Sequence, residues 1–350
     1  MTALFYIVTL LFALASAAYL QLPTFLLPLG YKWFFRYQIK RWFIRLGAIL
    51  FCLLFIITSN SWVAIMVGII PVIGLLIFSL LNANPKVYIA LSENQVIKSK
   101  HVIYPPVTEV LGYVDANGNA IVYPLNEMIK PRHILNDTFL GKPILISYCM
   151  ACRSAVVYNP VVQSQRLHFD VLGVYRRNMV MMDRLTGTVW QQGTGEAMCG
   201  LLKGTQLEIL AYQQTTLANW LEQYPNSWVA QESATVKDGI FSKDRLLKMM
   251  QITEWLVAPG KTNLDGLPLR APVFGVEING HAKAYPVAEL KKQSTFNDVL
   301  GGIEVTVNYN PVSNFITIIA THTNQPIAAQ SHWWFGWKEF HPNTGIWRAV

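Results

Sequence analysis

Two cysteines separated by two residues are the chemically most distinctive feature of this sequence. Cys149 and Cys152 directly follow an alternating apolar segment, residues 143–148, which predicts a β-strand. A pair of thiols at this spacing can hold a metal ion or cycle between dithiol and disulfide. Residues 155–158 again suit a strand, whereas a thioredoxin motif would continue into a helix. We therefore expect a metal-binding or thiol-redox site at a strand end, outside a thioredoxin fold.

A metal site would need further ligands, because a structural zinc ion usually takes four. The sequence has a single C-x-x-C pair, which excludes a four-cysteine ribbon. His133, the nearest histidine, and Cys199 would complete the set, and such ligands suit a soft or borderline metal ion, zinc or copper. His332 and His341 are further candidates in an aromatic segment whose rings we expect to pack in a core. The alternative is that the cysteines are inert, buried side chains.

The sequence repeats itself after its apolar N-terminal part. Residues 112–124 and 275–286 share an Asn-Gly pair followed by Tyr-Pro. Each copy then leads through a short helix-like stretch to Asn-Asp and to a strand that ends in Tyr. Two similar stretches that begin with Thr-Gly and end with Trp, at residues 186–190 and 344–347, extend the match. We therefore predict an internal duplication.

The cysteine pair is confined to the first of the two halves, which span roughly residues 105–230 and 270–350. The three candidate ligands of the first half have polar counterparts in the second. The aligned pairs are Cys149 with Asn310, Cys152 with Ser313 and, across one gap, His133 with Ser294. The turn residues are kept in both halves, whereas the sulfur and imidazole groups are not. This favours a site that one half has kept and the other has lost.

Local signals predict short strands with few helices. Asn117-Gly118 and Asn279-Gly280 lie between alternating apolar runs and predict two-residue hairpin turns, because both residue types tolerate positive φ. Residues 215–224 predict a helix that starts at a threonine and ends before a proline. The fold class that these patterns indicate for the water-facing part is α+β, mostly β.

The N-terminal part of the chain is much more apolar than the rest. Of all residues, 52% are hydrophobic and 14% are charged, whereas soluble domains have about 25% charged residues. Residues 2–29, 42–58 and 62–81 form apolar runs of the length that a spanning helix needs. We predict transmembrane α-helices, about three, over residues 1–82, followed by the β-rich domain over residues 83–350.

The first apolar run has a second interpretation, as a signal peptide, because an Ala-Ser-Ala-Ala stretch lies near residue 15. The lack of basic residues before it and its continuation to residue 29 favour a membrane span. Basic residues concentrate in the loop 31–45, which the positive-inside rule places in the cytoplasm together with the large domain. Cleavage of the first run would reverse this orientation.

The formal net charge of +8 reflects membrane-flanking loops, because the main basic cluster lies between two apolar runs. We therefore expect a multi-pass protein of the cell (inner) membrane. Its partners are the lipid bilayer and another protein, with no nucleic acid. A second charged group is expected at the surface of the large domain, and it consists of Arg176, Arg177, Asp183 and Arg184.

Several short motifs occur in order between residues 110 and 347. Residues 148–155 read Tyr-Cys-Met-Ala-Cys-Arg-Ser-Ala, and further motifs lie at residues 136–137, 182–190, 195–197 and 337–344. Together they resemble an uncharacterised prokaryotic family, the domain-of-unknown-function family three-one-seven-nine. That family's motif is Tyr-Cys-Pro-x-Cys-Gly-Ser-Ala, so Met150 and Arg153 depart from it. The resemblance implies no activity, it implies an exported domain, and it aligns the family's histidine with Arg132 rather than His133.

Three functions remain in competition. The first is a membrane-anchored protein of this uncharacterised family with a metal-binding or thiol-redox C-x-x-C site. The alternative is a non-catalytic, membrane-tethered scaffold or partner-binding module. A hydrolase-type enzyme is disfavoured, because the sequence contains no Gly-x-Ser-x-Gly, His-Glu-x-x-His or phosphate-binding loop.

Overall fold

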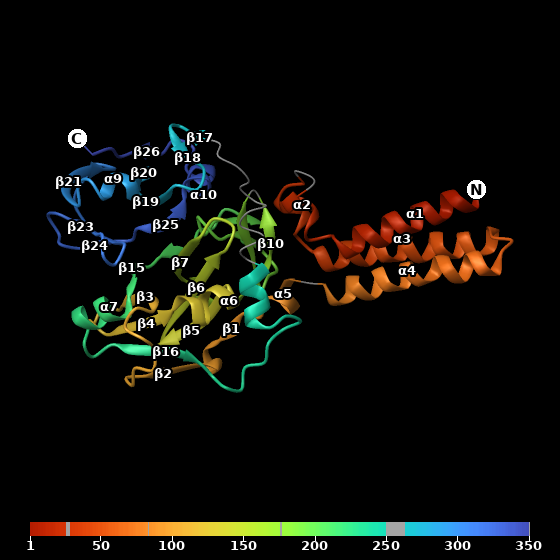
Figure 1. The fold of residues 1–350 in the computed structure, drawn as a ribbon, viewed down its shortest axis with the longest axis horizontal. Coiled ribbons are helices and arrows are strands. Elements are labelled where there is room, and N and C mark those ends of the chain that lie inside the picture. The colour runs from red at the N-terminus through yellow and green to blue at the C-terminus, as the bar shows by residue number, and fades with distance from the viewer. Residues whose placement is uncertain (26–28, 83, 176, 250–262, 350) are drawn as a thin grey trace.

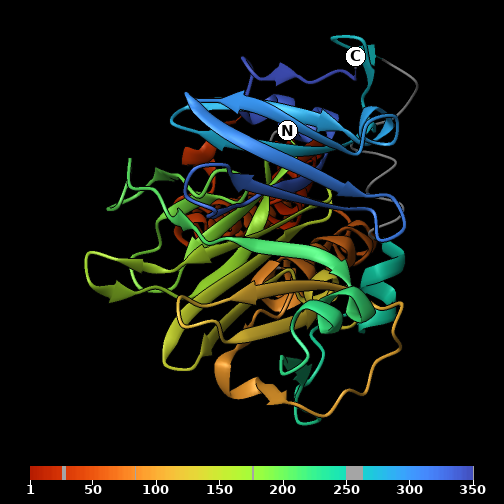
Figure 2. The same ribbon diagram turned by 90° about the vertical axis from the view of Figure 1, so that its left-hand side faces the viewer.

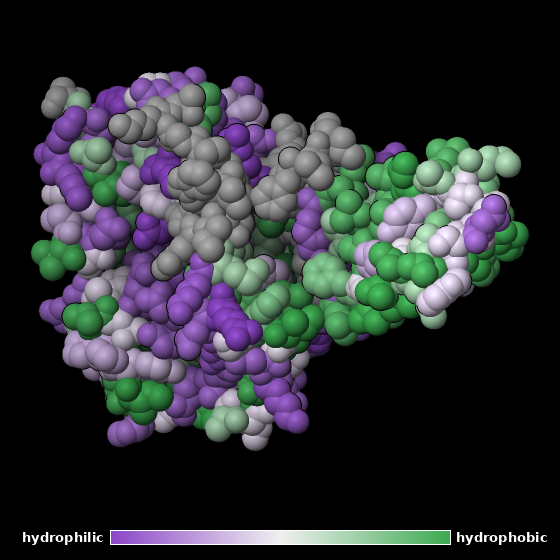
Figure 3. All heavy atoms as spheres, turned by 45° about the vertical axis from the view of Figure 1, so that its right-hand side comes forward, coloured by the Kyte–Doolittle hydropathy of each residue, from purple (hydrophilic) through white to green (hydrophobic). Residues whose placement is uncertain are grey.

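The structure is a computed structural model that describes residues 1–25, 29–82, 84–175, 177–249 and 263–349. An N-terminal bundle of helices projects from a β-rich body (Figure 1). Hydrophobic side chains cover the surface of the bundle that faces the viewer in Figure 3, whereas the body is largely hydrophilic. This contrast is what a membrane-embedded segment attached to a water-facing domain requires.

Two helices in the described part of the chain, α3 (Tyr37–Thr58) and α4 (Trp62–Leu81), are long and apolar enough to cross a membrane. Ser61, at the end of the turn between them, is the N-cap of α4, and its hydroxyl oxygen accepts a hydrogen bond from the Ala64 N–H at 3.3 Å. The third apolar helix, α1 (Thr2–Ala17), has 16 residues and falls short of the roughly 20 that a span needs. The predicted first span over residues 2–29 is therefore wrong in its extent.

The chain leaves α1 early because the next residues pack against the β-rich body. Tyr19 stacks on Trp33, with ring centroids 4.2 Å apart. Together with Leu20 and Phe34 these aromatic residues form a buried cluster with Leu172 and Val180 of the body. The short helix α2 (Leu22–Phe25) follows, and residues 26–28 of the predicted span lie outside the described residues.

Two arginines hold the body-facing ends of the helices together. Arg41, which is 2% exposed, donates to the backbone carbonyls of Ser16 and Ser79. Arg45 donates to the same Ser79 carbonyl at 2.7 Å and to its hydroxyl at 2.8 Å. The last carbonyls of a helix lack partners within the helix and carry partial negative charge. The guanidinium groups satisfy these carbonyls at the ends of α1 and α4.

Among the residues that the structure describes, five sheets of four or five strands make up most of the body in a propeller-like arrangement. Three of them come from the first part of the body, and their hydrogen-bonded orders are β1-β5-β6-β7-β14, β10-β11-β12-β13 and β15-β3-β4-β16-β2. The strands of the first sheet are β1 (Leu91–Ser92), β5 (Ile134–Phe139), β6 (Lys142–Cys149), β7 (Ser154–Asn159) and β14 (Glu208–Ile209). Those of the second are β10 (Phe169–Tyr175), β11 (Asn178–Asp183), β12 (Val189–Gln191) and β13 (Ala197–Cys199). Those of the third are β15 (Tyr212–Thr216), β3 (Glu109–Val114), β4 (Ala120–Pro124), β16 (Trp228–Glu232) and β2 (Val96–Ser99).

The last part of the chain forms the other two sheets, shown in blue above the rest of the body in Figure 2. Their orders are β25-β19-β20-β26 and β21-β22-β23-β24. The strands of the first are β25 (Gln330–Trp333), β19 (Pro272–Ile278), β20 (His281–Pro286) and β26 (Gly345–Ile346). Those of the second are β21 (Thr295–Leu300), β22 (Ile303–Asn310), β23 (Phe315–Ala320) and β24 (Pro326–Ile327). The prediction of a mostly β domain after apolar N-terminal helices is confirmed.

The two predicted halves contain sheets with the same internal order. The hairpin β3-β4 is flanked by antiparallel β15 and parallel β16, and β19-β20 is flanked by antiparallel β25 and parallel β26. In each sheet a short helix precedes the parallel strand, α7 (Leu217–Gln223) or α10 (Trp334–Phe340). Each helix packs the ring of one tryptophan against a glycine of the sheet. A Cβ on Gly112 would lie 2.1 Å from the Trp220 ring, and one on Gly275 would lie 2.2 Å from the Trp337 ring.

Further contacts recur in both halves. The Tyr123 hydroxyl donates to the Asp137 carboxylate at 2.8 Å, and the Tyr285 hydroxyl donates to that of Asp298 at 3.0 Å. The Tyr148 N–H donates to the His133 carbonyl and the Tyr309 N–H to the Ser294 carbonyl, both at 2.7 Å. These bonds match His133 with Ser294, which is the pairing that the sequence alignment predicts.

One predicted correspondence is wrong. The Thr-Gly stretch at residues 344–347 matches residues 186–190 in sequence, but the latter form the turn after β11 and the start of β12, in a different sheet. Its structural counterpart is Ser227, because the Trp220 and Trp337 indoles donate to Ser227 Oγ at 2.7 Å and Thr344 Oγ1 at 2.9 Å. The shared Thr-Gly pair indicates a local turn in both places, but it does not indicate which sheet contains the turn.

The two Asn-Gly turns differ. Asn279 and Gly280 both have positive φ, 52° and 77°, and join β19 to β20 as the predicted two-residue turn. The first turn has three residues, because Asp115 and Asn119 also pair. The Asp115 carboxylate accepts from the N–H groups of Asn117 at 2.9 Å and Asn119 at 2.8 Å, which stabilises the longer loop.

Candidate functional site

The cysteine pair lies in the tight connection between two central strands of the first sheet. Strand β6 ends at Cys149, β7 begins at Ser154, and these two residues pair across the hairpin. Both cysteines are free thiols, exposed by 1% or less. The Cys149 sulfur accepts from the Cys152 N–H at 3.5 Å and from the Met179 N–H at 3.3 Å. The predicted placement between two strands is confirmed.

The Cys152 sulfur is surrounded by polar groups. Asn178 Nδ2 donates to it at 3.0 Å, and Ser154 Oγ lies 3.2 Å away. The orientation of the Asn178 amide is determined by its other bonds, since Oδ1 accepts from the Gly193 N–H at 3.1 Å and Nδ2 also donates to Gln192 Oε1 at 3.1 Å. An amide N–H therefore points at the sulfur. A thiolate is a much better acceptor than a neutral thiol, so the Asn178 donor favours the charged form.

His332 approaches Cys152 from the other half of the body. Strand β25 joins the cysteine turn through the Trp333 N–H, which donates to the Cys152 carbonyl at 2.9 Å. His332 is 2% exposed, and its Nε2 lies 3.0 Å from Gln330 Oε1. Helix α10 packs directly on the site, because a Cβ on Gly336 would lie 2.4 Å from Cys152 Cβ. The sequence predicts His332 only as a further metal ligand, because the packing of β25 and α10 on the cysteine turn has no local sequence signal.

The two thiols differ in their preferred charge. Burial raises the pKa of Cys152, but the neighbouring Cys149 and His332 side chains act in the opposite direction and hold that pKa well below its usual range. Burial also raises the pKa of Cys149, and its hydrogen bond to Cys152 adds to this effect. The balance of burial and neighbouring groups therefore favours a thiolate on Cys152 over one on Cys149.

His133 lines a pocket together with Cys149 and has an unusual backbone conformation, with φ of 59° and ψ of −34°. Its ring is 2% exposed and makes an edge contact with Tyr88, with centroids 4.8 Å apart. Nδ1 lies 3.1 Å from the Tyr148 carbonyl oxygen, while Nε2 has no hydrogen-bond partner among the described residues. A carbonyl oxygen only accepts, so Nδ1 carries the proton. Burial lowers the pKa of His133 to about 4, which keeps the ring neutral.

We predict that this buried neutral imidazole makes the protein less stable in acid. The unfolded chain takes up a proton near the ordinary histidine pKa of 6.5, whereas folded His133 does so only at about 4. The free energy of unfolding should therefore fall as the pH drops from about 6.5 to about 4, by up to about 3 kcal/mol for this residue. His341, whose pKa burial also lowers to about 4, contributes in the same direction.

Thermal unfolding measured against pH checks this expectation. His133→Asn is a suitable variant, because asparagine tolerates positive φ. Its loss of stability between pH 6.5 and pH 4 should be smaller than that of the wild type. An unchanged pH profile would contradict the account of a buried neutral His133.

Two of the further candidate metal ligands lie away from the cysteine pair. Cys199 lies on β13 opposite Val189 and packs with the cluster around Phe34, near the helices. His341 stacks on Trp337, with ring centroids 3.8 Å apart. Within the described ranges, no three His, Cys, Asp or Glu side chains are grouped so that they could hold a metal ion. The four-ligand set of Cys149, Cys152, His133 and Cys199 therefore does not fit one ion in this arrangement.

Position 153 has a backbone conformation that suits glycine. Its φ of 55° is one that glycine adopts without cost, and the resembling family motif has glycine there. Its guanidinium lies over the Trp333 ring, 4.8 Å from the centroid, a contact that glycine would lack. Arg153 therefore combines a strained backbone with a second link between the cysteine turn and β25.

The predicted charged surface group is only partly correct. Asp183 is fully buried and accepts hydrogen bonds from the Trp190 indole at 2.9 Å and the Thr186 N–H at 2.5 Å. It stabilises the turn after β11 rather than facing water. Arg177 and Arg184 are exposed, and Arg184 pairs with Asp170 at 2.7 Å. Arg176 lies outside the described residues.

The aromatic C-terminal segment forms part of the core. Trp334 and Trp337 are fully buried, as predicted for the rings of this segment.

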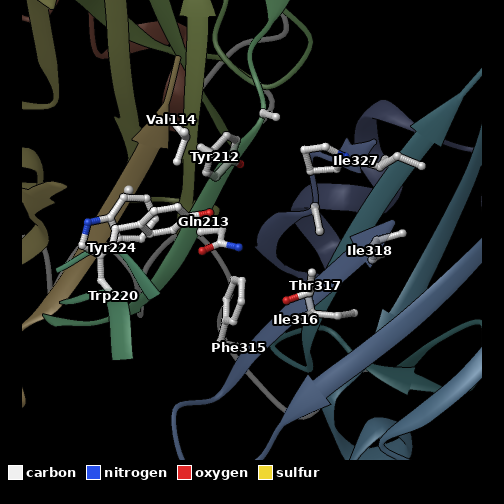
Figure 4. Close-up of a pocket in the computed structure, with 14 residues that line it drawn as sticks. Val114, Tyr212, Gln213, Trp220, Tyr224, Phe315, Ile316, Thr317, Ile318 and Ile327 are labelled. Carbon is white, nitrogen blue, oxygen red and sulfur yellow. The ribbon is translucent and has the colours of Figure 1, made fainter. Parts of the chain in front are cut away.

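A pocket of about 80 Å³ lies between the two halves of the body, where β15 faces β23 (Figure 4). Tyr212, Gln213 and Phe315 line it together with aliphatic side chains. None of its described lining side chains carries a formal charge.

A family profile described as "Protein of unknown function (DUF3179)" matches residues 90–242 and 257–325. No curated protein and no solved structure matches the chain. The matched residues include both cysteines, Asn178 and His133, whereas His332 lies beyond the matched range.

Proposed function

The chain belongs to the DUF3179 family of proteins of unknown function, and we propose that Cys149 and Cys152 act as a thiol-redox pair in a domain held beside a membrane. The observation that carries the proposal is the Asn178 amide, whose N–H is directed at the Cys152 sulfur by its bonds to Gly193 and Gln192. A cysteine that only fills space needs no such donor, since buried thiols behave as small hydrophobes.

The chemistry is a two-electron exchange. Oxidation joins the two sulfurs in a disulfide and releases two electrons and the proton of Cys149. A partner disulfide takes up the electrons by thiol–disulfide exchange, in which the Cys152 thiolate attacks one sulfur and the other leaves as a thiolate. Cys149 then attacks Cys152, which releases the second partner thiolate. The donors around Cys152 stabilise its thiolate and so favour the reduced state of the pair.

We further propose that the two halves arose by duplication and that the second has lost the site. The turn after β22 keeps the same capping function without sulfur. Asn310 Oδ1 accepts from the N–H groups of Val312 at 2.9 Å and Ser313 at 3.2 Å, just as the Cys149 sulfur accepts from the Cys152 N–H. An amide oxygen is the better turn acceptor, so the turn itself does not require cysteine at position 149.

A redox titration tests the thiol proposal. The full chain in detergent is equilibrated with dithiothreitol buffers of stepped potential, and its free thiols are trapped by alkylation and counted by mass spectrometry. We expect one two-electron transition in the wild type and in Cys199→Ser, and no transition in Cys149→Ser. Absence of a transition in the wild type would refute the redox proposal. Zinc or copper that is bound by the wild type and lost in Cys149→Ser would instead favour a metal site.

The two long apolar helices support a position beside a bilayer, and the side on which the domain lies is a separate proposal. Arg41 and Arg45 lie at the body-facing ends of the helices, which favours a cytoplasmic domain, whereas the family resemblance favours an exported one. A single cysteine introduced as Asn60→Cys in the turn between α3 and α4 decides this. A membrane-impermeant maleimide labels it in intact cells only if the domain is cytoplasmic.

The alternative function, a scaffold or partner-binding module, makes a different prediction. Its activity would survive replacement of both cysteines by alanine. The aromatic segment at residues 333–337 does not favour it, because Trp334, Phe335 and Trp337 are buried and offer little surface to a partner.

A further inference from the structure

A tight turn at the end of the second sheet carries an exposed leucine. The turn spans residues 200–204 and directly follows β13. The Leu202 N–H donates to Thr188 Oγ1 at 3.3 Å, and the Leu202 side chain packs on the core of the body. Leu201, the residue before it, is 80% exposed. The turn is therefore held in place while it keeps one large apolar side chain uncovered.

This turn lies beside the start of α3. Cys199, which precedes the turn, packs against the same buried cluster as Ile44 of α3. The short 3-10 helix η1 (Tyr31–Trp33), which comes shortly before α3, also contacts β13. The end of β13 is therefore packed against the segment through which the chain enters α3, and the turn continues from that point.

The start of α3 has the side chains that are typical of a membrane–water boundary. Trp42 and Phe43 are 55% and 63% exposed, and their rings meet edge to face with centroids 5.6 Å apart. Aromatic rings of membrane proteins concentrate at that boundary, between the polar headgroups and the acyl chains. Because Cys199 packs in the same cluster as Ile44, the next residue of α3, the turn lies near this boundary.

The charges beside the turn suit an anionic surface. Lys203 in the turn is exposed, as are Lys32 and Arg36 before α3. Residues 1–92 and 197–207 contain no Asp or Glu. Anionic lipid headgroups attract lysine and arginine side chains near a bilayer, and an adjacent apolar side chain adds to the binding when it is buried below the headgroups.

We propose that turn 200–204 is a membrane contact, in which Leu201 enters the boundary between headgroups and acyl chains and Lys203 binds anionic phospholipid headgroups. The inference rests on the position beside a bilayer proposed above and is independent of the redox chemistry. Strand β11 of the same sheet supplies Asn178 to the Cys152 sulfur. The contact therefore holds the cysteine site at a fixed distance from the bilayer.

Spin labelling of the full chain in lipid nanodiscs tests this contact. A nitroxide is attached to Leu201→Cys in a background that carries Cys52→Ser and Cys199→Ser, and the spectrum of the background alone is subtracted. The reference label is at Val312→Cys. Val312 is 93% exposed and lies just before β23, at the end of the body away from the helices (Figure 1). In discs of equal parts phosphatidylcholine and phosphatidylglycerol, we expect about tenfold fewer collisions with a water-soluble nickel chelate at residue 201 than at residue 312.

Removal of one charge tests the headgroup contact. Lys203→Gln should lose most of the additional protection of the Leu201→Cys label that phosphatidylglycerol gives over phosphatidylcholine alone. Lys291→Gln is the matched control, because Lys291 is exposed directly after α9 (Val287–Leu290), which also lies away from the helices (Figure 1). It should leave that protection unchanged.

The possible failures are distinguishable. Equal nickel collisions at residues 201 and 312, in chains that have entered the discs, would overturn the contact and leave the helical anchor intact. Failure of the chain to enter discs would overturn the position beside a bilayer itself. Equal protection by both lipid mixtures would overturn the role of Lys203. Dipolar broadening between labels would show a second copy of the chain on the turn, which would also overturn the assignment.

Discussion

Asn178→Asp is expected to abolish the Cys152 thiolate at neutral pH. The substitution replaces an N–H donor 3.0 Å from the sulfur by a carboxylate oxygen, and two negative charges at that distance cannot both persist in a buried site. Because a carboxyl group is the stronger acid, the proton goes to the sulfur. The pKa of Cys152 should rise by about two units or more, which ultraviolet thiolate absorbance measured against pH detects.

The redox consequence follows from the same charge balance. Loss of thiolate stabilisation favours the disulfide, so the reduction potential of the pair should become more negative by about 30 mV for each unit by which the pKa rises. Asn117→Asp is the control, since it adds the same charge in an exposed turn. A potential and an absorbance profile that are identical in Asn178→Asp and the wild type would show that Asn178 does not act on the sulfur.

Gly112→Ala and Gly275→Ala are expected to destabilise the body by similar, large amounts. An added Cβ would lie 2.1 Å from the Trp220 ring in one case and 2.2 Å from the Trp337 ring in the other. Both rings are fully buried, so neither can move without displacing its neighbours. Overpacking of this kind costs about 1–3 kcal/mol and occasionally more, and we expect the upper end of that range from thermal or denaturant unfolding.

Gly74→Ala serves as the control for these two substitutions. Gly74 lies in α4 with nothing within 4 Å of an added Cβ, and alanine is the better helix former there. Its stability should be equal to or above that of the wild type. If only one of the two body variants is destabilised, the two Gly-Trp contacts are not equivalent, and the proposed duplication loses its strongest structural support.

Local patterns in the sequence predicted the two strands that hold the site. Alternation over residues 143–148 and the later strand placed Cys149 and Cys152 in a hairpin connection, which the pairing of β6 with β7 confirms. The Asn279-Gly280 turn was predicted for the same reason, because its chemistry is contained in two residues. The longer Asn117-Gly118 turn was missed, because it depends on the carboxylate of Asp115, which accepts from both Asn117 and Asn119.

Contacts between distant segments could not be predicted in this way. His332 reaches Cys152 because β25 joins the cysteine turn and Gly336 lets α10 approach. Asn178 reaches the same sulfur from another sheet. Neither residue has a local signature, since a histidine among aromatics and an asparagine at a strand start are common. The early end of α1 was missed for a similar reason, because the apolar residues Tyr19 and Leu20 pack on the body instead of facing lipid.

The most direct test of the account is the charge on Cys152 in the native, reduced protein. Ultraviolet absorbance of the full chain in detergent, measured against pH, should reveal one thiolate at neutral pH that disappears in Cys152→Ser and persists in Cys199→Ser. If the wild type and Cys152→Ser have the same absorbance until the pH approaches the ordinary thiol pKa of 9.0, Cys152 is a neutral, packed side chain and the proposed activity is contradicted.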